Sequence, residues 1–364
     1  KLQKKKILIL CPFPQDVAAG QRLKYEQYLD NWRNNGYEVV VSSFMDKKMW
    51  DIVYLQGNLV GKILGTILGY FRRLYDLFRI SQFDIVYVFM WVTPLGSSFV
   101  ERLTRRMSNY LIYDIEDNIM HKNPHSPGTN SIVNYLRGSG KILYLIKQAD
   151  HVITSSPVLN NYCITVNQKK SCIYISSSVD TDNFIPSNNY NNDKKVVIGW
   201  TGTFSSKEYL DNLRDVLVKL NRICDFKLRV IGDFDYELPG VDLEVIRWTR
   251  ENEVKDLQGI DIGIYPLIED EWVSGKSGLK AIQYMAFGLP TVATNVGNTP
   301  SIIEHMENGW LVKSNEDWMY ALDRLIKTPA LRKKLGISAR KKVLENYSKH
   351  VIQDQYLLIL NRLE

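Results

Sequence analysis

The chain opens with alternating strand and helix patterns. Residues 6–11 form a continuous apolar run of strand length, and a loop with two prolines separates them from residues 21–34, where apolar side chains recur at helical spacing. Gly36 ends that helix, and residues 37–42 predict a second strand. Strand, loop, helix and strand predict a βαβ unit of Rossmann type. The fingerprint G-x-G-x-x-G is missing from its first turn, so bound NAD is not predicted.

The alternation starts again after residues 188–195, NNYNNDKK, a polar stretch without periodicity that predicts a linker. Residues 196–200 predict a buried strand, and strands and helices then follow in turn. A chain of 364 residues exceeds one ordinary core. We therefore predict an α/β fold of two Rossmann-like domains, over residues 1–187 and 196–348. The expected ligand site is a cleft between the carboxyl ends of the two sheets.

Residues 272–297, WVSGKSGLKAIQYMAFGLPTVATNVG, carry the clearest chemistry. A loop of small residues with Lys276 precedes a helix predicted near residues 279–287, which carries Lys280. Free N–H groups of the first helical turn, the helix dipole and the two lysines all favour an anion. The pattern indicates a diphosphate site. A plain loop, helix and strand with solvated lysines is an equally good interpretation.

Residues 58–79 repeat apolar side chains at helical spacing, and their charges are mostly positive. The charged residues are Lys62, Arg72, Arg73, Asp76 and Arg79. We favour a packed helix whose apolar face points inward and whose cations face water. The alternative is a contact with a membrane surface or a lipid phosphate.

Three carboxylates follow or end a strand predicted over residues 111–115. They are Asp114, Glu116 and Asp117. Ligands of open α/β sheets bind at the carboxyl ends of strands, so these groups are candidates for orienting hydroxyls or acting as a base. A helix cap or a turn cluster is the alternative, and we favour the functional interpretation.

Composition adds further limits. The apolar fraction of 45% and the charged fraction of 24% are those of a globular protein, and no apolar run is long enough to cross a membrane. Four cysteines without C-x-x-C spacing fit a reducing compartment and predict no metal site.

Charge is spread unevenly along the chain. Basic residues outnumber acidic ones by 22 to 15 in residues 1–185 and stand at 24 to 25 in the remainder. An anionic partner of the first half, other than a nucleic acid, is therefore expected. The basic first residues lack the apolar core of a signal peptide. We expect a cytoplasmic protein, at the inner face of the membrane if residues 58–79 bind lipid.

Five segments, in their order along the chain, resemble the retaining glycosyltransferases of family 4. They are PQDVAAGQRLKYEQYL, IYISSSVDTDNF, IGWTGTFSSKEYLDNL, DIGIYPLIEDEW and GLKAIQYMAFGLPTVATNVG, and the last is the most similar to the family. The resemblance covers nearly the whole chain and implies the GT-B fold, with the first domain binding the acceptor and the second the nucleotide sugar. It also implies that the last helix, residues 349–364, packs back on the first domain, and that neither a metal nor another cofactor is needed.

The resemblance implies roles for single residues. Lys276 and Lys207 would stabilise the departing phosphate, with Lys280 as a second choice. The residues expected to contact the donor are Gly202, Thr203, Trp248, Gly275, Ser277, Gly278, Leu279, Lys280 and Gln283. The residues expected at the first domain's edge are Gly20, Arg22, Asp117 and the catalytic candidates Asp114 and Glu116. A core indole remains the alternative for Trp248, and a solvated helix start the alternative for Arg22.

Two features depart from the family's pattern. Gly275 and Gln283 stand where many relatives carry a pair of glutamates, and Glu116 stands where many carry a histidine. Gln283 is then expected to contact the nucleotide as a neutral group.

We predict a retaining glycosyltransferase that moves a sugar from a nucleoside-diphosphate sugar to a glycan or lipid-diphosphate-linked acceptor. Bacterial surface polysaccharide or glycoconjugate synthesis is the expected setting, by analogy alone. The departures keep two alternatives open. One is a catalytically silent protein that binds nucleotide sugar or glycan, and the other is a sugar-nucleotide epimerase or hydrolase on the same fold.

Overall fold

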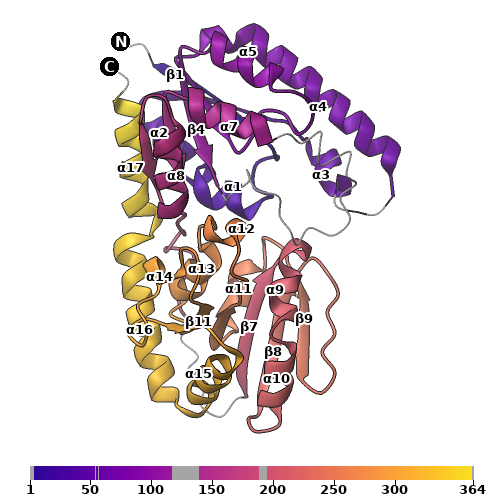
Figure 1. The fold of residues 1–364 in the computed structure, drawn as a ribbon, viewed down its shortest axis with the longest axis vertical. Helices are drawn as coiled ribbons and strands as arrows, with labels where there is room; N and C mark the ends of the chain where they lie inside the picture. Colours follow the sequence, from indigo (N-terminus) through magenta and orange to yellow (C-terminus); the bar gives the residue numbers. More distant parts are fainter. Residues whose placement is uncertain (1–3, 54, 56, 117–138, 188–194, 363–364) are drawn as a thin grey trace.

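The computed structural model describes residues 4–53, 55, 57–116, 139–187 and 195–362. It contains two α/β domains, each built on a six-stranded parallel sheet (Figure 1). The strands of the first sheet are β1 (Lys5–Cys11), β2 (Tyr37–Ser43), β3 (Ile85–Phe89), β4 (Tyr110–Ile115), β5 (His151–Thr154) and β6 (Cys172–Tyr174). Those of the second are β7 (Val196–Gly202), β8 (Phe226–Gly232), β9 (Asp242–Arg247), β10 (Ile262–Tyr265), β11 (Thr291–Thr294) and β12 (Trp310–Val312).

The strand orders are β2-β1-β3-β4-β5-β6 and β12-β11-β10-β7-β8-β9. In each sheet the first strand along the chain lies inside, with neighbours on both sides, as doubly wound folds require. The strands read as apolar runs because helices cover both faces of a parallel sheet. The predicted fold class of two Rossmann-like domains is confirmed.

The helices of the first domain are α1 (Ala19–Lys24), α2 (Leu29–Asn34), α3 (Lys47–Val53), α4 (Leu59–Arg79), α5 (Phe99–Met107), α7 (Ser139–Gln148) and α8 (Pro157–Val166). The helix predicted over residues 21–34 is interrupted: a 3-10 turn, Glu26–Tyr28, separates α1 from α2. Apolar periodicity continues through this turn, so the pattern did not mark the break.

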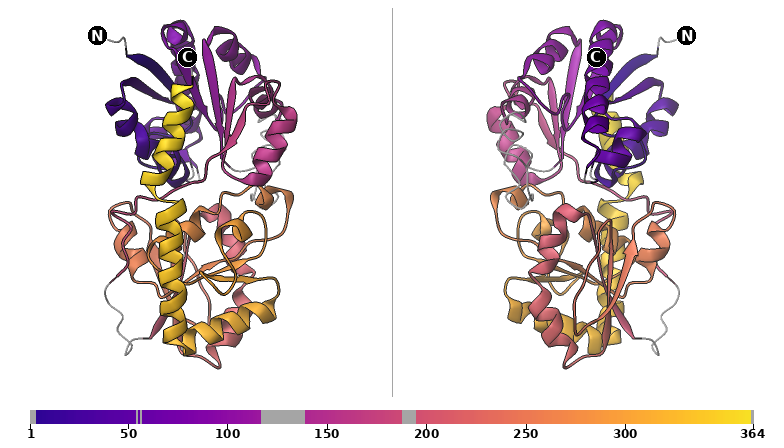
Figure 2. Two further views of the ribbon diagram at one scale, coloured as in Figure 1. Left: turned by 90° about the vertical axis from the view of Figure 1, so that its left-hand side faces the viewer. Right: turned by 90° about the vertical axis from the view of Figure 1, so that its right-hand side faces the viewer.

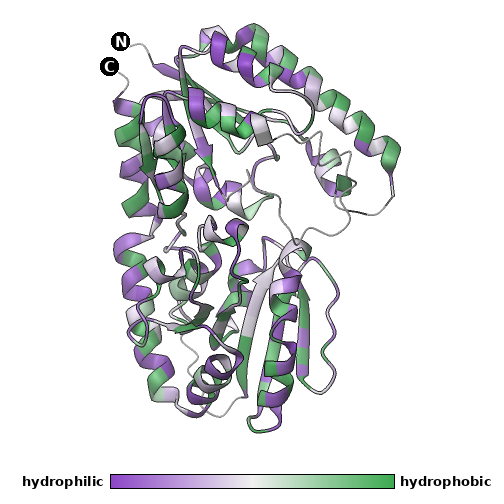
Figure 3. Ribbon diagram, viewed as in Figure 1, coloured by the Kyte–Doolittle hydropathy of each residue, from purple (hydrophilic) through white to green (hydrophobic). Residues whose placement is uncertain are grey.

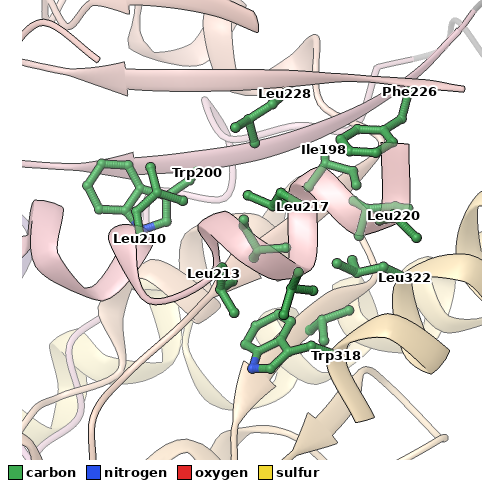
Figure 4. Close-up of a cluster of buried hydrophobic side chains, with 14 of the residues drawn as sticks. Ile198, Trp200, Leu210, Leu213, Leu217, Leu220, Phe226, Leu228, Trp318 and Leu322 are labelled. Carbon is green, nitrogen blue, oxygen red and sulfur yellow. The ribbon is translucent and has the colours of Figure 1, made fainter. Parts of the chain in front are cut away.

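The second domain and the chain's end contain α9 (Lys207–Asp211), α10 (Arg214–Asn221), α11 (Glu253–Gln258), α12 (Glu271–Ser274), α13 (Leu279–Ala286), α14 (Thr299–Ile302), α15 (Asn315–Lys327), α16 (Pro329–Asn346) and α17 (Lys349–Asn361). One core cluster of this domain joins β7, α10 and α15 (Figure 4). Trp200, Leu217 and Trp318 are members from these three elements, and each is at most 4% exposed. Burial of such side chains is the main stabilising term of the domain.

The last two helices run along one side of both domains (Figure 2). Ala339 of α16 lies in a core cluster of the second domain, whereas Tyr356 and Ile359 of α17 lie in the core of the first. The Tyr356 ring is 5.1 Å from the ring of Tyr28, centroid to centroid. The chain's end therefore returns to the first domain and packs there as an integral part of its core.

Tyr356 also reaches a buried ionic group under the first sheet. Its hydroxyl donates to Asp114 at 3.4 Å, the Tyr87 hydroxyl donates to the same oxygen, and Lys24 Nζ lies 3.6 Å from the other. Burial raises the pKa of Asp114, and the Lys24 ammonium opposes that shift. Asp114 is 0% exposed, and these contacts give it a structural role in the core of the first domain. Its catalytic role stays a prediction.

The orientation of α4 contradicts the favoured interpretation of residues 58–79. Its large apolar side chains face outward, whereas Arg73 and Asp76 are 1% and 2% exposed. Figure 3 shows the hydrophobic colouring along this helix, at the outer edge of the first domain. The periodicity separated two faces, but the face that packs on the protein is the one that carries Gly69, Arg73, Asp76 and Leu77.

We expect Asp114→Ala to lower the free energy of unfolding by about 3–5 kcal/mol, because Lys24 would stay buried without its carboxylate. Urea unfolding followed by tryptophan fluorescence measures this loss. Asp114→Asn keeps the shape of the side chain and should cost less. An alanine variant with wild-type stability and no turnover would instead support a catalytic role for Asp114.

Candidate functional site

Residues 274–280, here called the lysine loop, lead from α12 into α13. Gly278 precedes α13 with a φ of +79°, in the left-handed region that favours glycine. Asn298 donates from Nδ2 to the Ser277 carbonyl at 2.9 Å. Gly275 and Ser277 are buried in this turn, and Leu279 packs against a core cluster of the domain. The turn therefore has a fixed path into the first helical N–H groups, which favour an anion.

Both lysines of the loop extend toward the chain that follows β7. Lys280 Nζ donates to Ser206 Oγ at 3.0 Å and lies 4.9 Å from the centre of a Trp200 ring. Lys276 Nζ lies 5.5 Å from the ring centre of Tyr209. Two segments far apart in sequence, each predicted to contact the donor, are thus neighbours in space.

Gly202 ends β7, and Thr203 follows it. A side chain at position 202 would be crowded, since its Cβ would come within 2.6 Å of the Trp200 ring and 2.5 Å of Ser206 Oγ. The Thr203 hydroxyl pairs with Ser205 Oγ at 2.9 Å. The glycine at 202 is what allows the strand end and the Ser206 turn to approach each other.

Lys207 has a different environment from the other two lysines. Its Nζ is 2.7 Å from Asp211 Oδ2, one turn along α9, and 5.3 Å from the Tyr236 ring centre. These contacts direct the ammonium to its own helix, and contact of Lys207 with a phosphate stays a prediction.

Glu253, which the sequence analysis missed, connects three of the predicted residues. Its carboxylate accepts from Arg22 at 2.7 Å, from Trp248 Nε1 at 3.4 Å and from Gln283 Nε2 at 3.5 Å. The side chains of Arg22 and Glu253 are 11% and 5% exposed, so this ion pair is largely desolvated. Arg22 belongs to the first domain and the other three residues to the second, so Glu253 joins the domains at the predicted site. The sequence shows acids in the first turn of this short helix after β9, Glu253 and Asp256, but not which of them is buried.

A second ion pair joins the domains nearby. Arg250 Nη1 contacts Asp16 Oδ1, and the two side chains are 45% and 65% exposed. This pair is solvated, unlike that of Arg22 and Glu253, and it offers a natural comparison.

The predicted carboxylates do not form one group. Glu116 is 8% exposed and its carboxylate lies directly against Gly20, where a Cβ would collide with it. Asp114, two residues earlier, points into the core. Asp117 lies outside the described residues. Of the described carboxylates, Glu116 is the one that stands with Gly20 at the first domain's edge.

Two negative findings concern the described part of the chain. No group of three His, Cys, Asp or Glu side chains there could hold a metal ion. Among the helices described, none has the length and apolar character needed to cross a membrane.

Residues 195–328, which contain β7, Glu253 and the lysine loop, match the model of the family described as glycosyl transferases group 1. The chain carries a glycosyltransferase domain. Its membership of family 4 in particular stays a prediction.

Two relatives are similar over parts of the chain. The N-acetyl-α-D-glucosaminyl L-malate synthase of Bacillus anthracis is 32% identical over 81 residues, which are 22% of this chain and 21% of that protein. An uncharacterized glycosyltransferase of Methanocaldococcus jannaschii is 26% identical over 180 residues, 46% of this chain and 44% of that one. The matches thus span less than half of either relative.

Solved structures are similar over the full length in fold. Sucrose-phosphate synthase from Thermosynechococcus elongatus has a TM-score of 0.72 at 15% identity, with 99% of each chain covered. HepE of Anabaena, solved with UDP and glucose, has a TM-score of 0.66 at 14% identity, over 98% of this chain and 100% of that chain. At these identities the likeness shows the GT-B fold of the glycosyltransferase domain and its partner domain.

A double-mutant cycle of Arg22→Ala and Glu253→Ala should give a coupling energy of roughly 1.5–3 kcal/mol in the free energy of unfolding, as for a desolvated charged hydrogen bond. The same cycle on Asp16 and Arg250 should stay below about 1 kcal/mol, because water screens an exposed pair. Equal coupling energies in the two cycles would contradict the inference that the buried pair is the stronger one.

Proposed function

We propose that the protein is a retaining glycosyltransferase that takes a sugar from a nucleoside-diphosphate sugar and passes it to a hydroxyl of a glycan or lipid-diphosphate-linked acceptor. The observation that carries the proposal is the meeting of the lysine loop with the chain after β7, through Lys280 and Ser206 at 3.0 Å. The glycosyltransferase domain match spans both segments. Bacterial surface polysaccharide or glycoconjugate synthesis in the cytoplasm, where the four free cysteines would stay reduced, is the proposed setting.

The hydrogen-bond donors and cations of the site suit the most difficult step of such a transfer, the departure of the diphosphate. The bond between the anomeric carbon and the diphosphate oxygen breaks, and negative charge grows on the departing phosphate. Lys276, Lys280 and the first N–H groups of α13 would stabilise that charge, since fixed donors cost no reorganisation during the reaction. In a retaining transfer the acceptor oxygen bonds to the same face of the sugar, and its proton passes to the departing phosphate.

Glu253 supplies a carboxylate close to one of the positions that depart from the family's pattern. Gln283 replaces a usual glutamate, but the carboxylate of Glu253 lies 3.5 Å from the Gln283 amide. A negative group is therefore present beside that position, supplied by α11. This supports an active enzyme over a silent binding protein, although Arg22 neutralises part of the charge.

A thermal-shift panel of UDP, GDP, ADP, CMP, dTDP and NAD tests the donor site. We expect one diphosphate to raise the unfolding midpoint selectively, since a ligand at 100 times its Kd adds about 2.7 kcal/mol of stability. UDP is the first candidate, because HepE was solved with it. NAD should give no shift. A midpoint that no diphosphate moves would overturn the proposed donor site, and binding without turnover would favour the silent protein.

Lys276→Ala should lower kcat roughly a hundredfold or more, because a donor to the departing phosphate acts mainly in the transition state. Lys219→Ala, on the exposed side of α10, removes the same charge elsewhere and should leave kcat unchanged. Turnover with the donor that the panel identifies is the measurement. A folded Lys276→Ala enzyme with wild-type kcat would remove this residue from the mechanism.

A further inference from the structure

The outward face of α4 is a continuous apolar stripe. Ten large side chains between 46% and 77% exposed make up this stripe. They are Leu59, Val60, Ile63, Leu64, Ile67, Leu68, Phe71, Leu74, Tyr75 and Phe78. Their spacing of three or four residues places them along one side of the helix. A stripe of this size is rare on a protein that has no partner for it.

The opposite face of α4 explains why the stripe points outward. Gly61, Gly65 and Gly69 are four residues apart and form one side of the helix. A Cβ on each would come within 2.6, 2.8 and 2.5 Å of Asn58, Met49 and Phe44 respectively. Larger residues do not fit there, so the helix packs on α3 and the end of β2 through its glycines.

Arg73 secures the same orientation at the other half of the helix. It is 1% exposed and donates to the carbonyls of Cys11 and Val92, both at 2.8 Å, and to Asp76 at 3.0 Å. Turning the stripe inward would remove these bonds and leave a buried guanidinium unsatisfied. The exposed stripe is therefore a fixed feature of the fold.

The charges beside the stripe are cationic. Asp76 is the acid of α4, and it is buried between Arg73 at 3.0 Å and Arg79 at 2.8 Å. Arg72 is paired with Asp46 at 2.6 Å, and Lys62 adds a further cation near the start of the helix. At its carboxyl end, Lys6 and Arg79 share a surface hollow of about 430 Å³ with Glu38 and with Tyr75 and Phe78 of the stripe.

We propose that α4 lies on an anionic lipid bilayer, with the stripe among the acyl chains at the interface and the flanking cations at the headgroups. A helix of 21 residues is about 31 Å long and offers a straight line of contact to a flat surface. Of the ten stripe side chains, only Tyr75 carries a hydrogen-bonding group, whereas interfaces between proteins have a polar rim. This favours hydrocarbon over a second copy of the chain.

The arrangement goes beyond the proposed transfer and does not depend on it. Figure 1 places α4 along the outer edge of the first domain, with the second domain at the far end of the molecule. A bilayer under α4 would thus lie against the domain that carries Glu116 and Gly20, and leave the lysine loop clear of lipid.

Flotation with vesicles tests the proposal on the full chain without nucleotide. Vesicles of phosphatidylcholine and phosphatidylglycerol in equal amounts should bind the protein. The double variant Leu64→Glu, Leu68→Glu should lower the bound fraction roughly tenfold or more, because it removes two apolar side chains that would be buried among the acyl chains. Its unfolding midpoint should not change, since the two side chains are 56% and 51% exposed. Phe78→Ser, at a position 77% exposed, is a milder second variant that should also weaken binding.

Ile337→Glu on α16, at a side chain 59% exposed, is the matched control and should float like the wild type. Binding that survives in both stripe variants would show an electrostatic contact alone and overturn the role of the stripe. A wild-type protein that does not float would also overturn the proposal, as would a dimer by light scattering that the stripe variants convert to monomers. None of these results bears on the nucleotide panel, so the two proposals fail separately.

Discussion

The ion pair between Arg22 and Glu253 is the contact on which the site depends. Each partner follows the carboxyl end of a strand, Arg22 after β1 and Glu253 after β9, so the pair joins the two sheets at the edge where ligands of such folds bind. Because both side chains are largely removed from water, separating them would leave two charges in need of solvation. This carboxylate, which Gln283 and Trp248 also contact, is thus one of the groups that hold the two domains together at the site.

The fold was predictable because its signal is local and repeated. Strands buried on both faces read as apolar runs, and residues 6–11 and 196–200 are such runs. The order of elements then leaves few topologies. Asp114 shows the limit of this reasoning: a carboxylate at a strand's end can face the edge or the core, and the choice depends on Lys24, Tyr87 and Tyr356, which are distant in sequence.

The site was predictable in part. The lysine loop was found from small residues before a helix, and the segment after β7 from its resemblance to a glycosyltransferase family. The structure brings the two together through Lys280 and Ser206. Glu253 was missed because nothing in a short helix with several acids marks the buried one. The inward face of α4 was mistaken for a solvated one, although the glycine spacing at 61, 65 and 69 was visible in the sequence. Apolar periodicity gives two faces of a helix, and close packing through glycine decides which one touches the protein.

The buried Arg73 and the exposed hydrophobic side chains of α4 have one physical cause. The buried Arg73 is satisfied by two carbonyls and Asp76, so polar contacts hold much of the inner face on the domain. The outer face then carries apolar area of which about half or more stays in water in the folded protein and adds nothing to folding. Such area is stabilised only when another apolar phase covers it. The geometry of α4 therefore separates the two tasks: polar contacts hold the helix on the domain, and the apolar stripe remains available for a surface outside it.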